Sequence, residues 1–340
     1  MRDQVRIQPN LATTHTPRVN RVTRLAPSPT GSLHLGNART FLINWAIARQ
    51  RGWSIVLRIE DLDTPRIKPG VNELTIDLLR WLGIDWDSGP TLQSTDLAPY
   101  RDAMQTLASK GLCYPITASR TEGASDGASA PQEGSHEARF ASVNRPRVLP
   151  SSFAWDASAN AAWRYVTPEG EVTFIDEFAG PQKWNPSTSV GDFILWTKRN
   201  QPAYQLAVVV DDHLQGVTDV VRGDDLLDSA ARQLLLYRAL DQHAEPTYWH
   251  LPLIIGADGK RLAKRHGESR LDMYRAKSVP VERVIGLIAQ WCGIDQETSR
   301  NKPVCPMSAA EFRERLDLRT ITRTPIVFTR EDDAWLLNAR

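Results

Sequence analysis

The chain is poor in cysteine and contains no long apolar run. Its three cysteines, Cys113, Cys292 and Cys305, form no Cys-x-x-Cys pair, so their spacing indicates neither a disulfide framework nor a closed zinc site. No stretch of about eighteen consecutive apolar residues occurs, which argues against a membrane-spanning helix. The sequence therefore favours a protein of the reducing cytoplasm that does not enter a membrane.

Net charge is also lacking, because 41 basic side chains face 40 acidic ones. A molecule so balanced does not attract nucleic acid by bulk charge, so any RNA contact requires a local basic surface. The 340 residues suffice for one catalytic body with an insertion and a small C-terminal appendage. Residues 1–20 have no apolar stretch of the kind a secretory signal needs, and they are predicted to form a flexible leader.

The first hundred residues predict the start of a parallel sheet. Arg21 to Ala26 reads as a strand, a helix opens near Leu33 and ends at Gly52, and Ile55 to Ile59 reads as a second strand. A strand, helix and strand in this order imply a right-handed crossover, with a ligand cleft beyond the carboxyl ends of the strands. Glu60 and Asp61 are expected at that edge.

Beyond residue 60, local sequence patterns predict the remaining helices and strands. Apolar spacing predicts further helices and strands, and a Pro/Gly turn predicts a hairpin. The expected helices are 71–82, 97–110, 228–240 and 281–291; the expected strands are 193–197, 205–210 and 251–255; the expected hairpin is 163–175. Residues 121–137 carry almost no apolar side chain and are predicted to be a flexible loop.

The segment from Arg24 to Asn37 is typical of a nucleotide site. A short strand passes through a Pro/Gly turn into a helix start that carries His34 and Gly36. Backbone N–H groups at a helix N-terminus can hold phosphate. Late in the chain, the basic run from Lys260 to Gly267 can bring several cations onto a polyphosphate.

These residues resemble a known family, the glutamyl-type class I aminoacyl-tRNA synthetases. Its "HIGH" signature is matched by His34 to Asn37, and its "KMSKS" signature by Arg261 to Arg265. Four further blocks follow the family's order: Arg58 to Asp63, Gly191 to Phe193, Tyr204 to His213 and Val221 to Leu226. A single short block would be weak, but their number and order make chance similarity remote.

The resemblance implies an α/β fold, a Rossmann-like class I catalytic core with a parallel sheet, an inserted acceptor-type subdomain and a short helical C-terminal part. We expect the two halves of the catalytic domain at 21–110 and 191–275, the insertion at 111–190 and the C-terminal segment at 276–340.

The resemblance also implies an ATP-dependent, AMP-forming ligase, in which rate comes from positioning and from neutralising charge on phosphate. His34 would donate to the phosphates, Gly36 would leave room for the nucleotide, and Lys264 would meet the pyrophosphate. The expected ATP-binding residues are Pro27, Thr30, Gly31, His34, Gly36, Asn37, Arg261, Leu262 and Lys264. Ala263 stands where the signature often has serine, which predicts weaker support of the loop. The plainer alternatives are a helix cap for His34 and a solvated turn for Lys264.

An L-glutamate pocket is implied by the same resemblance. Its expected residues are Arg24, Leu25, Ala26, Pro27, Ser28, Glu60, Tyr204 and Arg222. Arginine pairs with carboxylate through two hydrogen bonds, so Arg24 or Arg222 would favour glutamate over glutamine, while Glu60 would pair with the substrate ammonium.

These residues also have structural alternatives. Arg58 with Glu60, or Arg222 with Asp224, could instead be ion pairs at strand ends, and Tyr204 could be a core aromatic.

No metal site made of protein side chains is expected. Some relatives hold zinc through a Cys-x-Cys pair just after the helix that ends here near Gly111, but Ile116 and Ala118 stand at those positions, so no structural zinc is predicted. Magnesium is expected with ATP, held chiefly by the phosphates.

The expected acceptor is implied by the resemblance together with the length of the chain. About 75 residues remain after Arg265, too few for the large helical portion that reads the anticodon. The chain thus resembles the branch of the family that lacks this portion and attaches glutamate to the queuosine base at the wobble position of tRNA(Asp). Two alternatives stay open: charging of the 3′ end of tRNA(Glu), and a catalytically silent paralogue that acts as a binding module. No obligate protein partner is evident.

Overall fold

The computed structural model describes residues 20–116, 140, 145–146, 148–156, 161–242, 244–260, 262, 269–294 and 304–338. The predicted leader, apart from Asn20, and the predicted loop 121–137 lie outside these residues, as do Arg261 and Lys264.

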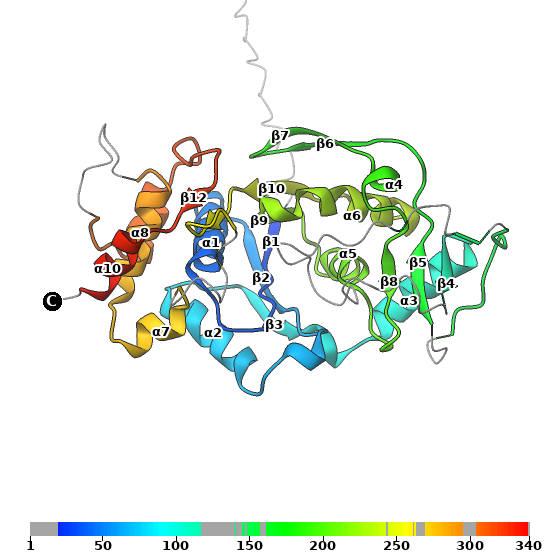
Figure 1. The fold of residues 1–340 in the computed structure, drawn as a ribbon, viewed down its shortest axis with the longest axis horizontal. Coiled ribbons are helices and arrows are strands. Elements are labelled where there is room, and N and C mark those ends of the chain that lie inside the picture. The colour runs from blue at the N-terminus through cyan, green and yellow to red at the C-terminus, as the bar shows by residue number, and fades with distance from the viewer. Residues whose placement is uncertain are drawn as a thin grey trace, which may run out of the picture.

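A seven-stranded sheet forms the centre of the molecule (Figure 1). In spatial order its strands are β3 (Ser88–Leu92), β2 (Ser54–Ile59), β1 (Val22–Leu25), β9 (Asp219–Gly223), β10 (Thr247–Leu251), β6 (Val172–Asp176) and β7 (Gly180–Trp184). Every neighbouring pair is parallel except β6 with β7. The carboxyl ends of six strands therefore meet at one edge, which is where open parallel sheets of α/β proteins bind their ligands.

The predicted strand, helix and strand at the N-terminus are confirmed. Helix α1 (Leu35–Arg51) runs between β1 and β2, which pair in parallel with Val22 opposite Ser54. Gly52 ends the helix in the left-handed region at φ 67°, a conformation that other residues adopt at a cost.

Two hydrophobic cores flank the sheet. The first lies under α1 and takes in α2 (Val71–Trp81), α7 (Leu271–Ala276), α8 (Val281–Trp291), α9 (Ala309–Arg315) and α10 (Arg330–Leu337). A small parallel pair, β11 (Ile254–Ile255) with β12 (Ile326–Val327), joins the sheet region to this helical part. The predicted α/β core and helical C-terminal part are thus confirmed, and these helices lie on the left of Figure 1.

The second core lies on the other side of the sheet, on the right of Figure 1. It combines α3 (Ala98–Ser109), α5 (Tyr204–Leu214) and α6 (Leu227–Ala239) with an antiparallel sheet of β4 (Cys113–Ile116), β5 (Ala162–Tyr165) and β8 (Ile194–Trp196). The short helix α4 (Pro186–Ser189) precedes β8. The predicted helices at 97–110, 228–240 and 281–291 and the strand at 193–197 are confirmed within one or two residues.

The strand predicted at Gln205–Val210 is wrong, because these residues form the first turns of α5. All residues from Tyr204 to Asp212 are buried, so the segment is apolar on every side and carries no alternation that separates a buried helix from a buried strand. Its run of β-branched valines favoured the strand, and packing between α3 and α6 overrode that preference.

The hairpin predicted at Trp163–Ile175 is also wrong. β5 pairs with β4 and β8, whereas β6 pairs with β10 and forms its hairpin with β7, so the turn at Pro168 links two different sheets. A Pro-Glu-Gly turn suits either connection, and long-range pairing decided between them. The strand expected at Leu251–Ile255 is likewise divided: β10 ends at Leu251, and Pro252, which has no N–H to donate, separates it from β11.

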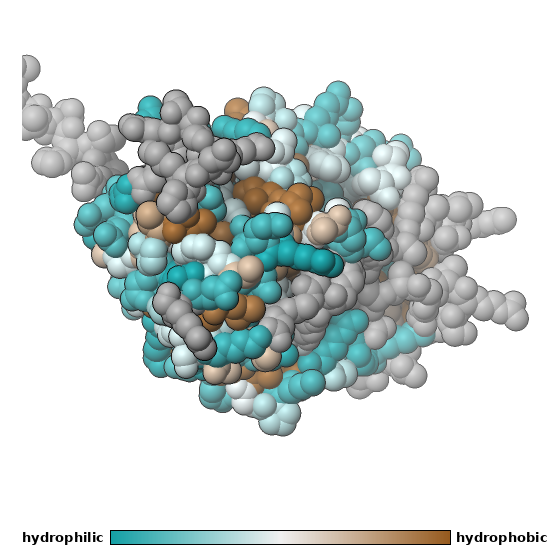
Figure 2. Space-filling view, turned by 60° about the vertical axis from the view of Figure 1, so that its left-hand side comes forward, coloured by the Kyte–Doolittle hydropathy of each residue, from teal (hydrophilic) through white to brown (hydrophobic). Residues whose placement is uncertain are grey.

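Figure 2 turns the helical C-terminal part towards the viewer; hydrophilic residues cover most of this face, with apolar residues in small groups between them. No helix among the described residues is long and apolar enough to cross a bilayer.

Candidate active site

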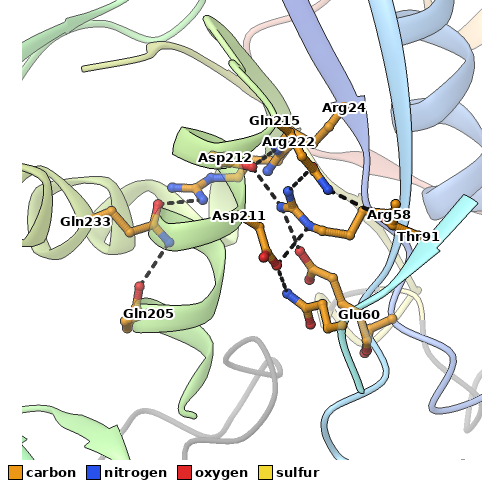
Figure 3. A network of polar contacts seen from close by, with 12 residues as sticks. Arg24, Arg58, Glu60, Thr91, Gln205, Asp211, Asp212, Gln215, Arg222 and Gln233 are labelled. Carbon is orange, nitrogen blue, oxygen red and sulfur yellow. Dashed lines mark hydrogen bonds and ion pairs between the residues drawn. The ribbon is translucent and has the colours of Figure 1, made fainter. Parts of the chain in front are cut away.

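The carboxyl-end edge of the sheet gathers the charged residues that the sequence singled out (Figure 3). Arg24 comes from β1, Glu60 follows β2, Arg222 lies in β9, and Tyr204 begins α5. The loops after β1 and β2 hold each other, since the Glu60 N–H donates to Pro27 O at 3.0 Å and Ser28 Oγ donates to Glu60 O at 3.2 Å. Of the remaining candidates for glutamate, Leu25 is fully buried and Ala26 follows it at the end of β1.

The pKa values of Tyr204 and Glu60 show that these charged groups lie close together. Burial raises the pKa of Tyr204, against the lowering effect of the Arg222 and Arg24 guanidinium groups. Burial also raises the pKa of Glu60, although Arg58 and Arg24 lower it. Four of the residues predicted for glutamate therefore act on one another at one place, as the sequence expected. Their roles in binding stay predictions.

Arg58 is held entirely by the protein. Its side chain, 1% exposed, lies 2.8 Å from Asp212 Oδ1, 3.2 Å from Glu60 Oε1 and 3.6 Å from Asp211 Oδ2. These carboxylates raise the pKa of Arg58 well above its ordinary value although burial lowers it. The alternative that Arg58 and Glu60 form an ion pair is confirmed, and Arg58 serves to fasten β2 to α5.

The rest of this cluster also holds Asp211 in place. Gln93 Nε2 donates to its Oδ2 at 2.6 Å, and the Tyr100 hydroxyl lies 2.9 Å from its Oδ1. Asp212 additionally lies 3.4 Å from Arg24 Nε. Arg24 is thus partly neutralised by the protein.

Arg222 differs, because its partners among the described residues are neutral acceptors. It is 5% exposed; Nε donates to His250 Nε2 at 2.9 Å, one terminal nitrogen to Gln233 Oε1 at 2.9 Å and the other to Leu226 O at 3.2 Å. A guanidinium has five N–H donors, so two remain for a ligand. A buried cation held by neutral acceptors keeps its charge available for an incoming anion.

Asp224 is not the partner of Arg222. Burial and the neighbouring Asp225 raise the pKa of Asp224 to about 6, which a paired arginine would oppose. The alternative of an ion pair between Arg222 and Asp224 is wrong: Arg222 donates to His250, Gln233 and Leu226, and Arg39 is the cation that acts on Asp224.

His34 caps α1. Its Nδ1 accepts hydrogen bonds from the N–H groups of Gly36 at 3.1 Å and Asn37 at 3.3 Å, and the His34 N–H in turn donates to Asn37 Oδ1 at 3.2 Å. In the neutral ring this geometry leaves the proton on Nε2. The cap alternative is therefore confirmed, and the same ring keeps a donor on the other side.

Gly36 makes room for this ring. A Cβ at residue 36 would stand 3.0 Å from His34 Cε1 and 3.1 Å from Nδ1, so the glycine allows the imidazole to lie over the helix end. The sequence predicted that Gly36 leaves space for a nucleotide; the contact found in the structure is with His34. Pro27, Thr30 and Gly31 lie in the loop between β1 and α1.

Leu262 of the second signature and the residues that follow the signature are tied to the region around α1. Leu262 is fully buried and its N–H donates to Ile254 O at 2.9 Å. After the signature, the Leu35 N–H donates to Ser269 O and the Leu271 N–H to Leu33 O, both at 2.9 Å. The two predicted halves of the ATP site are therefore neighbours, although Arg261 and Lys264 themselves lie outside the described residues.

The strand that follows α3 is held by an ionic cluster. Asp192, fully buried, accepts from the Tyr114 hydroxyl at 2.7 Å, the Thr167 N–H at 2.9 Å and two nitrogens of Arg145 at 2.6 and 2.8 Å. Ile116 ends β4 nearby, and Ala118 lies outside the described residues. No group of three or more His, Cys, Asp or Glu side chains in the described part of the chain could hold a metal ion. That structural zinc is absent stays a prediction.

Sequence reasoning missed several members of the site. Asp211 and Asp212 stood inside a recognised block but received no role; their signal was two carboxylates directly after an apolar run. His250, Gln233 and Asp176 carried no local signal, because each lies in its own buried element and meets Arg222 or its partner only in the fold.

Comparison with known proteins gives the family. Residues 20–323 match the model of the catalytic domain of class I tRNA synthetases, E and Q type. The chain belongs to this family. It is a class I aminoacyl-tRNA synthetase-like ligase, as the resemblance implied.

The curated relatives fall into two groups. The chain is 42% identical over 313 residues to "Glutamyl-Q tRNA(Asp) synthetase" of Symbiobacterium thermophilum, covering 89% of this chain and 94% of the relative. It is 40% identical to the protein of the same name from Rhodopirellula baltica, covering 90% and 96%. With "Glutamate--tRNA ligase" of Parasynechococcus marenigrum it shares 36% identity, covering 85% of this chain and 62% of the relative.

Solved structures agree on the fold. The "Glutamate-tRNA Synthetase from Elizabethkingia anophelis" superposes with a TM-score of 0.74 at 25% identity, covering 93% of this chain and 70% of that one.

Proposed function

We propose that this class I synthetase activates L-glutamate with ATP to glutamyl-adenylate and transfers the glutamate to the queuosine base at the wobble position of tRNA(Asp). The observation that carries the amino-acid part is Arg222, a buried guanidinium with neutral partners and two free donors at the edge of the sheet. A side-chain carboxylate supplies the missing anion, whereas the neutral amide of glutamine does not.

The other groups at this edge suit the rest of the substrate. Glu60, 10% exposed and beside Arg24, is the carboxylate that would receive the substrate ammonium. Tyr204 is buried close enough to Glu60, Arg24 and Arg222 for their charges to act on its hydroxyl. The α-carboxylate of glutamate would then attack the α-phosphate of ATP, forming the C–O–P bond of the adenylate as pyrophosphate leaves.

The start of α1 supports the ATP part. The N–H groups of Leu35, Gly36 and Asn37 already donate to Ser269 O and His34 Nδ1, and this cap leaves His34 with its proton on Nε2, the form that donates to phosphate. Lys264 would meet the pyrophosphate from the loop whose flanks are bonded to Ile254 and Leu35. Magnesium would enter with ATP, on the phosphate oxygens.

The proposed acceptor rests on the relatives. Proteins named Glutamyl-Q tRNA(Asp) synthetase are matched over 94% and 96% of their length, whereas the first glutamate ligase is matched over 62% of its length. The chain thus aligns with nearly all of the former and with the catalytic portion of the latter.

The test has two stages. Pyrophosphate exchange into ATP is measured with glutamate and without tRNA; exchange excludes the silent binding module. Transfer of radiolabelled glutamate is then compared on purified tRNA(Asp) with queuosine, tRNA(Asp) without it, and tRNA(Glu). Transfer to the first alone is the expected result. Transfer to tRNA(Glu) would contradict the proposed acceptor and favour the ordinary ligase.

A further inference from the structure

A second layer of buried groups lies behind Arg222. His250 in β10 accepts from Arg222 Nε, and its other ring nitrogen, Nδ1, lies 2.6 Å from Asp176 Oδ2 at the end of β6. Both side chains are fully buried. The following argument rests on the proposed function of Arg222 as the group that binds the glutamate carboxylate.

The hydrogen bonds of Asp176 fix its orientation. Oδ1 accepts from the N–H groups of Phe178 at 3.0 Å and Ala179 at 2.6 Å, the His250 N–H is shared between Oδ1 at 3.1 Å and Oδ2 at 3.2 Å, and the closest partner of Oδ2 is the His250 ring. Burial alone would raise the pKa of Asp176, but the hydrogen bonds from the His250 ring and from backbone N–H groups outweigh it and lower the pKa. Asp176 is therefore an ionised carboxylate that only accepts.

This carboxylate determines the tautomer of His250. Burial, together with the charge of Arg222, lowers the pKa of His250 to about 4, so the ring is neutral at neutral pH even though Asp176 and the Leu226 backbone oppose the shift. Because Oδ2 only accepts, the ring proton lies on Nδ1 and the lone pair on Nε2. The lone pair then faces Arg222 Nε–H at 2.9 Å.

We infer that Asp176 and His250 are positioning residues that hold Arg222 in the orientation for carboxylate binding without consuming its charge. Asp176 acts on Arg222 only through the neutral imidazole, so the guanidinium is oriented by a carboxylate that it does not contact. A carboxylate in direct contact, as at Arg58, would compete with the substrate for the same cation.

A chain of amides supports the opposite side of the guanidinium. Gln233 accepts from Arg222 and donates to Gln205 Oε1 at 3.0 Å (Figure 3). Gln205 in turn donates to Ser229 Oγ at 3.2 Å. Each amide has one orientation that satisfies both neighbours. The neutral acceptors of Arg222 are thus themselves fixed from behind, as precise positioning of a binding group requires.

The decisive variant is Asp176→Asn. The backbone N–H groups at Oδ1 require the amide oxygen there, so the amide nitrogen faces His250 Nδ1 and forces the proton onto Nε2. Two donors then confront each other at Arg222, as when the analogous change in a catalytic triad selects the wrong tautomer. We expect the KM for glutamate in pyrophosphate exchange to rise about 10- to 100-fold, the value of a hydrogen bond to a charged group, with the KM for ATP unchanged.

Two substitutions at His250 separate positioning from packing. His250→Gln offers a donor to Asp176 and an acceptor to Arg222, and it should retain most of the glutamate affinity. His250→Leu offers neither and should behave as Asp176→Asn does. The His250→Leu and Asp176→Asn enzymes should also lose their preference for glutamate over glutamine in proportion to the rise in KM.

Asp219→Asn is the matched control. Asp219 is fully buried in the same strand as Arg222, but it binds Arg21 and Trp249 at the amino end of β9. It should lower the midpoint of urea unfolding without a selective change in the KM for glutamate. If all variants raised the KM values for glutamate and ATP equally, or if Asp176→Asn changed neither, the positioning role would be overturned.

A second readout does not depend on activity. Nitrogen NMR of the imidazole rings, with His250 identified by the glutamine variant, should show a proton on Nδ1 in the wild-type chain and on Nε2 in Asp176→Asn. A wild-type ring protonated on Nε2 or on both nitrogens at pH 7 would overturn the inference. Failure of glutamate-dependent exchange in a wild-type chain with the expected tautomer would count against the proposed function instead.

Discussion

Arg58-Ile59-Glu60 and Arg222-Gly223-Asp224 have the same spacing at the ends of two parallel strands, yet the fold uses them in opposite ways. Arg58 meets three carboxylates and contributes to the joint between β2 and α5. Arg222 meets an imidazole, an amide and a backbone carbonyl rather than Asp224. A buried arginine surrounded by carboxylates is structural, whereas one surrounded by neutral acceptors is available to an anionic ligand.

The largest effect expected from this comparison is on stability, at Arg58. Arg58→Leu leaves Glu60, Asp211 and Asp212 buried near one another with their closest cation removed and Arg24 still 3.4 Å from Asp212, which should cost about 3–5 kcal/mol of unfolding free energy. Urea unfolding measures it. Arg58→Lys should recover only part of the loss, because an ammonium cannot reproduce the planar fork. Unchanged stability in Arg58→Leu would show that the cluster does not hold the sheet to α5.

Arg222→Leu should show the reverse pattern. The KM for glutamate should rise by roughly 30- to 5,000-fold, which corresponds to about 2–5 kcal/mol for one partner of a buried charge pair. Stability should fall less than in Arg58→Leu, since removal of an uncompensated buried charge offsets the hydrogen bonds lost. Exchange kinetics and urea unfolding on the same preparation check both. A larger stability loss than at Arg58 would contradict the distinction.

His34 tests the comparison at the ATP end, where one ring has both a structural and a proposed binding role. His34→Ala should lose about 1 kcal/mol of stability with the cap and about 10²- to 10³-fold in exchange rate with the phosphate donor. Asparagine is a good N-cap, so His34→Asn should restore the stability but not the rate. Recovery of both would mean that His34 is only a cap.

The smallest effect concerns Asp224. Its pKa of about 6 in the folded protein lies above the ordinary value of 3.8, so the folded state holds the proton more tightly. Its contribution to stability is present below about pH 4 and is lost as the pH rises through 6. The wild type should therefore lose stability relative to Asp224→Asn across this window, by less than about 1 kcal/mol because Asp224 is partly exposed. Parallel pH profiles would indicate that Asp224 is paired after all.

The sequence predicted the fold where local signals and long-range pairing agree. Gly52 ends α1, and the apolar spacing of 281–291 defines α8. The sequence-based prediction failed at α5, where apolar residues show no helical periodicity because all sides are buried. It also failed at the turn near Pro168, because the flanking strands pair with strands distant in the sequence. Both failures have the same cause. A segment that is buried on all sides, or that pairs with a distant strand, carries no local sequence pattern that reveals its structure.

The site was predictable only in part for the same reason. Arg24, Glu60, Tyr204 and Arg222 stand in recognisable blocks and meet at the sheet edge. Which arginine is neutralised could not be read from two identical spacings. That depends on Asp212 and His250, which reach Arg58 and Arg222 from other elements.

A crystal structure of the chain with L-glutamate tests the central claim most directly. We expect the glutamate side-chain carboxylate within hydrogen-bond distance of Arg222, with the Arg222–His250 bond kept and the Arg58 cluster unchanged. Glutamate bound with its side chain away from Arg222, or Arg222 turned onto a carboxylate of the protein, would contradict the account.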